Sequence, residues 1–327
     1  MQPQVDFKPV DGAPNPLSLS NLDQLNAKGG TNVYLTSVDD VTKNPPWLTG
    51  VKPDASGKTN GATTSVVVVN THADGIVDAF YFYFYSFNLG NKVLGQNLGN
   101  VSEFGVFFSL LETLPQILLE NSNANSDCQC SMLATGKKML RANCCIFLLT
   151  LFREHVMVRF KNGLPTSLWY SQHEYGEAFT YQAVEKQGAR PVAYSATGSH
   201  ANYATAGTHD HTIPGVNLPV GPLEDHTDKG TLWDPILSAY FFSYDGNSKA
   251  FTAYDNSAPT NFLKFVGRWG DRKYPDGDSR QKKFFNIDAT AKYVDGPTGP
   301  EDKQLVRRNV CPDKQGFICV VRPILGP

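Results

Sequence analysis

Histidine and carboxylate side chains gather in one part of this chain. Side chains of these two types can bind divalent cations. Four of the seven His lie between positions 173 and 211. Imidazole and carboxylate groups are the donors from which protein cation sites are built. The candidate ligands are Glu154, His173, Glu174, His200, His209, Asp210 and His211. The clustering predicts a site for a divalent cation, Ca²⁺ or Mg²⁺.

The spacing of these residues matches no established metal motif such as HExxH, so the prediction rests on the clustering. In the segment GSHANYATAGTHDH (198–211), Gly198 and Gly207 would let the backbone turn tightly and return His200 and His209 to one rim. The alternative for each single His is a hydrogen-bonding role in a loop.

Other residues of this region suggest hydrolytic chemistry less strongly. Ser195 and Ser199 are not in a GxSxG turn, and Ser199 is adjacent to His200, which disfavours a nucleophilic triad. A metal-dependent hydrolase remains an alternative, in which a cation activates water and Glu154 or a His is the base. Asp225 and Asp228 are expected to cap turns, with a role as oxygen ligands as the alternative.

The elements that would position these residues are short strands. The 28 Gly and 21 Pro are spread along the chain and separate short apolar or aromatic runs, which predicts a mainly β fold, an antiparallel β-sandwich with short connecting helices. The expected strands are 65–70, 78–87, 156–160, 167–171, 191–195, 239–244 and 317–322.

The run DAFYFYFYSF (78–87) predicts a strand that is buried on both faces. Alternation places Tyr81, Tyr83 and Tyr85 on one face, and Phe82 and Phe84 on the other. We expect core packing, with a carbohydrate or lipid platform as the alternative. The turn HADG (72–75) would join this strand to SVVVVN (65–70) as a hairpin.

Charge and hydropathy exclude some classes of function. The 29 Lys and Arg nearly balance the 31 Asp and Glu, so no basic field is available to bind nucleic acid. The sequence contains no apolar run of about 18 residues, so we predict no transmembrane segment. The N-terminal residues lack the basic start and apolar region of a signal peptide.

Residues 101–153 differ in composition from the rest of the chain. They hold four of the six Cys and no Trp or Tyr. An inserted helical lid is one interpretation. We favour another, because two intron donors and acceptors can be written in their codons. Removing both introns would join Gly99 and Asn100 through His-Val-Gly-Asp-Trp to Glu154 and His155. We therefore interpret residues 101–153 as translated introns and not as a domain.

Several segments together resemble the fungal vacuolar protein sorting-associated protein 62 family. They include NLDQLNAKGGTNVYLTS (21–37), VDAFYFYFYSFNLG (77–90), SQHEYGEAF (171–179), RPVAYSATGSHANYATAGTHDH (190–211) and GRWGD (267–271). The resemblance covers nearly the whole chain except the insert, which implies one β-rich domain formed by residues 1–100 and 154–327. Members of this family begin earlier with a secretory leader, so the chain is expected to be truncated at its N-terminus.

A more remote resemblance concerns the restored sequence Gly-Asn-His-Val-Gly-Asp-Trp-Glu-His. It is similar to the GHRHDWE heptapeptide of the necrosis-inducing NLP-type proteins, which are secreted β-sandwiches that hold a divalent cation. In the present chain, only Glu154, followed by His155, remains from that motif.

Outside the insert, only Cys311 and Cys319 remain, in the segment CPDKQGFIC. They predict a hairpin closed by a disulfide, and therefore an oxidising compartment. Two buried free thiols are the alternative.

Taken together, the sequence favours a non-enzymatic protein of the secretory pathway, vacuolar or extracellular, with a cation or ligand site and with a lipid headgroup or glycan as its partner. An NLP-like secreted factor that acts on membranes and a metal-dependent hydrolase are the two alternatives.

Overall fold

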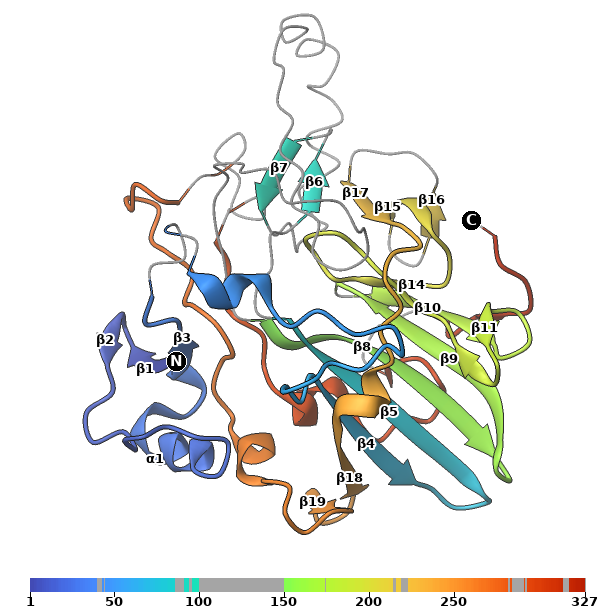
Figure 1. Cartoon of the computed structure of the whole chain (residues 1–327), viewed down its shortest axis with the longest axis horizontal. Coiled ribbons are helices and arrows are strands. Elements are labelled where there is room, and N and C mark those ends of the chain that lie inside the picture. Colours follow the sequence, from blue (N-terminus) through green and yellow to red (C-terminus); the bar gives the residue numbers. More distant parts are fainter. Residues whose placement is uncertain are drawn as a thin grey trace, which may run out of the picture.

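A computed structural model gives the architecture of the chain (Figure 1). It describes residues 1–39, 43, 45–85, 91–93, 96–99, 150–173, 175–213, 216–218, 223–281, 283, 291, 293–313 and 318–326. Side chains are described for these residues except 91–99, 150–153 and 211–223. The interpretation of residues 101–153 as translated introns falls mostly on residues outside the described ones. It stays a prediction.

An eight-stranded sheet forms the centre of the molecule, in the order β19-β18-β4-β5-β8-β9-β10-β20. Its strands are β4 (Ser65–Thr71), β5 (Ile76–Tyr85), β8 (Thr150–Lys161), β9 (Leu164–Gln172), β10 (Tyr175–Thr180), β18 (Ala239–Asp245), β19 (Ala250–Ala253) and β20 (Val321–Arg322). Strand β18 is parallel to β4, and β20 is parallel to β10, while the other pairs are antiparallel. The predicted mainly β fold is confirmed, and its large sheet is mixed.

A second sheet of five strands carries part of the candidate site, in the order β16-β15-β17-β6-β7. Its strands are β6 (Asn91–Val93), β7 (Gln96–Gly99), β15 (Gly207–Ile213), β16 (Val216–Leu218) and β17 (Leu223–Thr227). Figure 1 shows this sheet beyond one end of the large sheet.

Smaller elements complete the described part of the chain. The remaining strands are β1 (Gln2–Val5), β2 (Lys8–Pro9), β3 (Tyr34–Thr36), β11 (Lys186–Gln187), β12 (Arg190–Pro191), β13 (Tyr194–Ser195) and β14 (Asn202–Tyr203). The helices are α1 (Asn26–Gly29) and the 3₁₀ turns η1 (Leu22–Leu25), η2 (Gly30–Asn32), η4 (Pro46–Thr49), η6 (Pro235–Ser238), η7 (Asn261–Lys264) and η10 (Pro300–Lys303). They are short, as predicted, and no helix of the described residues is long and apolar enough to cross a bilayer.

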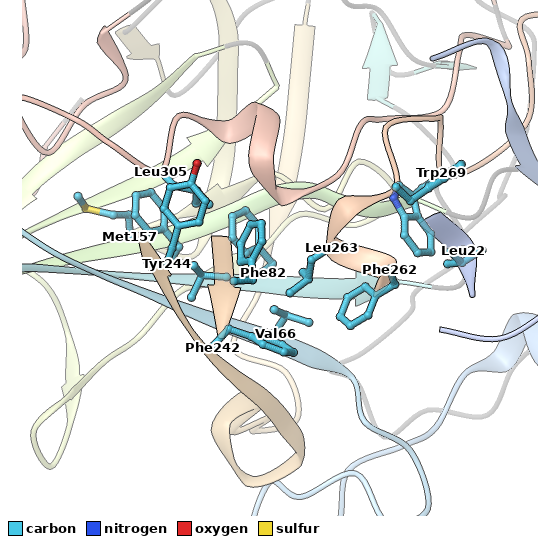
Figure 2. Close-up of a cluster of buried hydrophobic side chains, with 14 of the residues drawn as sticks. Leu22, Val66, Phe82, Met157, Phe242, Tyr244, Phe262, Leu263, Trp269 and Leu305 are labelled. Carbon is cyan, nitrogen blue, oxygen red and sulfur yellow. The ribbon is translucent and has the colours of Figure 1, made fainter. Parts of the chain in front are cut away.

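The aromatic strand β5 separates two hydrophobic cores. Phe80 and Phe82 belong to the larger core, with Phe242, Phe262 and other side chains drawn in Figure 2. Tyr83, on the other face, belongs to a second core with Leu168, Tyr170 and Phe179. The prediction of a strand buried on both faces, with Phe and Tyr on opposite sides, is therefore confirmed. The β4–β5 hairpin is also confirmed by their antiparallel register.

The remaining predicted strands agree with the structure to different degrees. Segments 156–160, 167–171 and 239–244 lie within β8, β9 and β18. Segment 191–195 is divided between the short strands β12 and β13. Among the described residues of the last predicted strand, Val321 and Arg322 alone are assigned to β20.

A buried arginine holds the segment after η10 on the large sheet. The Arg307 guanidinium donates to the backbone carbonyls of Lys303, Gln304 and Val310, and lies over the Phe80 ring. It also contacts Nε2 of His155 at 2.8 Å. Because arginine can only donate, His155 accepts this hydrogen bond as a neutral ring.

Candidate functional site

The candidate site begins with Glu154, which lies buried in β8 at 2% exposure. The Ser171 hydroxyl, in β9, donates to its Oε2 at 2.6 Å. The backbone N–H of His173 donates to its Oε1 at 3.2 Å. Both carboxylate oxygens therefore accept hydrogen bonds from the end of β9 and the turn that follows it.

Asp225, in β17, is the second buried carboxylate, at 1% exposure. Its Oδ1 accepts a hydrogen bond from the Ser199 hydroxyl at 2.6 Å. Its Oδ2 accepts one from the Tyr203 hydroxyl at 2.7 Å and lies 2.7 Å from Nε2 of His173. Asp225 therefore joins three segments that are far apart in the sequence. The expectation that it caps a turn is wrong, because it lies within a strand.

The register between β15 and β17 places His209 next to Asp225. His209 is paired with Asp225, so the two side chains share one face of the sheet. The His209 ring stacks on Tyr203, with 3.9 Å between centroids and 9° between planes. Its Nε2 lies 2.8 Å from the Thr227 hydroxyl, on the same face.

A third buried carboxylate, Glu177 in β10, is near enough to act electrostatically on the Tyr203 hydroxyl, as Asp225 and Glu154 do. Its Oε2 accepts a hydrogen bond from the Gln172 amide at 2.9 Å, and its Oε1 pairs with the Arg322 guanidinium. Burial raises the pKa of Tyr203 well above its usual range, and the nearby charges of Asp225, Glu177 and Glu154 raise it further. The Tyr203 hydroxyl therefore stays protonated and donates to Asp225. Glu154, Glu177 and Asp225 are called the acidic cluster below.

His200 packs against Tyr85, a side chain that is affected by the charge of Glu154. Its ring stacks on Tyr85, with 3.9 Å between centroids and 7° between planes. Burial raises the pKa of Tyr85 to about 12, and the charge of Glu154 also raises it, while the hydrogen bond to Ser195 acts in the opposite direction. Glu154 is therefore close enough to affect the Tyr85 hydroxyl electrostatically.

Two of the candidate His have backbone angles that non-glycine residues adopt rarely. The φ angle is +56° at His173 and +64° at His200. His173 lies in the turn between β9 and β10, and His200 between β13 and β14. These left-handed turns direct both residues to the region of the acidic cluster.

The structure brings some of the predicted ligands together and separates others. Glu154 and the backbone of His173 are joined by a hydrogen bond, and His209 is the strand partner of Asp225 on the same face of the smaller sheet. Asp210 is also buried, but strand alternation places it on the opposite face of β15 from His209. Glu174 and the side chain of His211 lie outside the described residues. Within the described part of the chain, no group of three or more His, Cys, Asp or Glu is arranged to hold a metal ion.

The central residues Tyr203 and Glu177 were not among the candidates from the sequence. Their role depends on strand register and tertiary contact, which no spacing in the sequence reveals. A signal for Asp225 was present, because LEDHT (223–227) reads as a strand with acidic and hydroxyl residues on one face.

The order of the hydrogen bonds argues against an activated serine. In a Ser-His-Asp triad, the imidazole lies between the hydroxyl and the carboxylate and removes the proton from the hydroxyl. Here the Asp225 carboxylate lies between Ser199 and His173. The Ser199 hydroxyl therefore donates to Oδ1 of the carboxylate, whereas His173 contacts Oδ2.

Two curated proteins of Saccharomyces cerevisiae are similar to the chain. It is 33% identical over 302 residues to "Putative vacuolar protein sorting-associated protein TDA6", a match that covers 86% of the chain and 53% of that protein. It is 31% identical over 296 residues to "Vacuolar protein sorting-associated protein 62", covering 85% of the chain and 52% of that protein. The chain thus spans about half the length of these relatives.

No family model matches the chain, and no solved structure matches it significantly. The resemblance to the necrosis-inducing proteins stays a prediction. The two yeast relatives indicate the same family as the sequence segments did. Over the region that it shares with them, the chain belongs to the vacuolar protein sorting-associated protein 62 family.

Proposed function

We propose that this chain is a non-enzymatic binding protein of vacuolar protein sorting, and that the acidic cluster is where it binds a divalent cation, Ca²⁺ or Mg²⁺. The observation that carries the proposal is the grouping of Glu154, Glu177 and Asp225 around the buried Tyr203 hydroxyl. Like charges in a buried site destabilise one another, and a bound cation would offset that repulsion. Carboxylate oxygens are also the donors that Ca²⁺ and Mg²⁺ prefer.

The described residues supply only part of such a site. If residues 101–153 are translated introns, further ligands would come from the sequence that splicing restores. Without the introns, His-Val-Gly-Asp-Trp would directly precede Glu154. The new Asp would stand two positions before Glu154, on the same face of β8 if the strand continues. We therefore propose that the spliced form, which lacks residues 101–153 and carries this pentapeptide, holds the complete cation site.

Two further observations support a role in the secretory or vacuolar route. Cys311 and Cys319 form a disulfide, as the sequence predicted, and protein disulfides form in oxidising compartments. The names of the two yeast relatives associate them with vacuolar protein sorting.

A cation titration of the spliced form tests the proposal. Ca²⁺ or Mg²⁺ should raise its melting temperature, because a ligand that binds only the folded state stabilises it. Glu154→Gln should abolish that rise, whereas Glu185→Gln, at an exposed carboxylate outside the acidic cluster, should preserve it. A melting temperature that is independent of both cations would refute the cation site.

A further inference from the structure

The chain from 318 to 326, called the edge segment here, is bound to the large sheet by few contacts. Strand β20 pairs with β10 at only two positions, Ala178 with Val321 and Phe179 with Arg322. Three of its apolar side chains are largely exposed, Ile318 at 89%, Val320 at 63% and Ile324 at 72%. A segment with so little buried surface depends on its other attachments to stay on the sheet.

One of these attachments is an arginine that reaches the acidic cluster. The Arg322 guanidinium pairs with Oε1 of Glu177 and lies 4.5 Å from the centre of the Phe179 ring. Glu177 is buried, so removing its arginine would leave a charge of the acidic cluster poorly compensated. The edge segment therefore contributes positive charge to the candidate site from outside it.

Leu325 also packs against the second core, and a further attachment is covalent. The Cys311–Cys319 disulfide ties the edge segment to Cys311, which is packed in the larger core. Arg307 and the neighbouring backbone keep the chain before Cys311 on the sheet independently. Opening the disulfide would therefore release the edge segment and leave the chain before Cys311 in place.

We propose that the Cys311–Cys319 disulfide is a reducible clasp that controls whether Arg322 compensates the acidic cluster. When the clasp opens, β20 leaves β10 and Arg322 withdraws from Glu177. The effect of this charge change on cation binding rests on the proposed function. The release of the edge segment does not.

The reductant required is a dithiol. Its thiolate attacks Sγ of Cys319, the less buried of the two cysteines, and forms a mixed disulfide. Cys311 leaves as a thiolate and takes up a proton. The second thiol of the reductant, as its thiolate, then attacks the reductant's own sulfur in the mixed disulfide, and Cys319 leaves and is protonated. Two electrons and two protons pass to the protein, and the reductant becomes a cyclic disulfide.

Amide hydrogen exchange of the full chain, oxidised and reduced with dithiothreitol, tests the clasp. Reduction should speed exchange at least tenfold in residues 319–324 and at the β10 edge, and leave β4 and β5 unchanged. The double variant Cys311→Ser, Cys319→Ser should show the fast exchange without reductant and no further response to it. Equal protection in the oxidised and reduced chains would overturn the clasp.

Two variants separate the ion pair from the disulfide. Arg322→Gln should speed exchange of the edge segment in the oxidised chain, and Arg322→Lys should restore part of the protection. If both variants exchange like the parent chain, Arg322 does not hold the segment and the inference fails.

In the spliced form, reduction should raise Mn²⁺ affinity. Fast exchange with no Mn²⁺ binding in either redox state would leave the clasp standing and count against the proposed function alone.

Discussion

At the scale of single residues, Asp225 holds the candidate site together. It accepts hydrogen bonds from two hydroxyl groups and contacts an imidazole nitrogen, all within 2.7 Å. Hydrogen bonds to an ionised acceptor are stronger than those between neutral groups. The position therefore needs an acceptor with two oxygens, which an amide cannot supply.

We expect Asp225→Asn to destabilise the fold, because the new amide N–H group would face donors. The free energy of unfolding should fall by about 2–4 kcal/mol, measured by urea denaturation. Asp228→Asn, three positions later at an exposed site, is the matched control and should change it by less than about 0.5 kcal/mol. Equal stability of the two variants would show that Asp225 is not central to the cluster.

A second residue-scale prediction concerns Asp271 and pH. Burial raises the pKa of Asp271 to about 6, while the charge of Arg280 acts in the opposite direction. The folded state therefore binds this proton more tightly than the unfolded state does. Its contribution to stability is fully present below the unfolded value near 4 and is lost as the pH rises through about 6.

Asp271→Asn should remove this dependence. Relative to the parent chain, the variant should gain on the order of 1–2 kcal/mol between pH 4 and pH 7. Chemical denaturation at a series of pH values measures the difference. Asp302→Asn, at an exposed position, should leave the pH profile of the parent chain unchanged. A variant that tracks the parent at every pH would contradict the raised pKa.

At the scale of elements, the sequence predicted the strands best where burial on two faces dictated their composition. Residues 80–85 of β5 are all aromatic, and their alternation assigned Phe82 and Tyr83 to opposite faces, in agreement with the two cores. Segment 191–195 carries no such pattern, and it is divided between strands of two residues each. The pairing of β20 with β10 joins residues about 140 apart, so no local pattern could reveal it.

The candidate site was predictable only in part for the same reason. Clustering of His and acidic residues directed attention to the region of His173 and His209. The pairing of His209 with Asp225 depends on the register between β15 and β17. The position of Glu177 depends on the register between β10 and β9 in the large sheet. These are tertiary facts, because one face of each strand is selected only when its neighbour is known.

An element-scale prediction follows from the buried guanidinium of Arg307. Arg307→Met keeps much of the side-chain volume but leaves the carbonyls of Lys303, Gln304 and Val310 without their donor. We expect a loss of about 2–4 kcal/mol in the free energy of unfolding. Hydrogen exchange should rise in residues 300–311. Arg308→Met is the control, because that side chain is mostly exposed, and it should exchange like the parent chain.

At the scale of the whole molecule, two sheets and the end of the chain meet at the acidic cluster. Strand β8 of the large sheet provides Glu154, strand β17 of the smaller sheet provides Asp225, and β20 brings Arg322 to Glu177. The charged residues of the acidic cluster and its arginine therefore come from three parts of the fold. Binding at this point would stabilise the contact between the two sheets.

The spliced form should consequently be more stable than the long form when a cation is present. We expect its melting temperature to exceed that of the long form in Ca²⁺ or Mg²⁺, with the difference reduced by a chelator. Scanning calorimetry of both forms, with and without chelator, measures this. A chelator that lowers both melting temperatures equally would indicate a cation site that does not depend on the restored motif.

The most direct test of the cation site is anomalous diffraction from crystals of the spliced form grown with Mn²⁺. We expect an anomalous peak within coordinating distance of the Glu154 carboxylate, on the side of Asp225 and Tyr203, which disappears in Glu154→Gln. A fully ordered acidic cluster with no anomalous peak, or a peak bound elsewhere on the molecule, would contradict it.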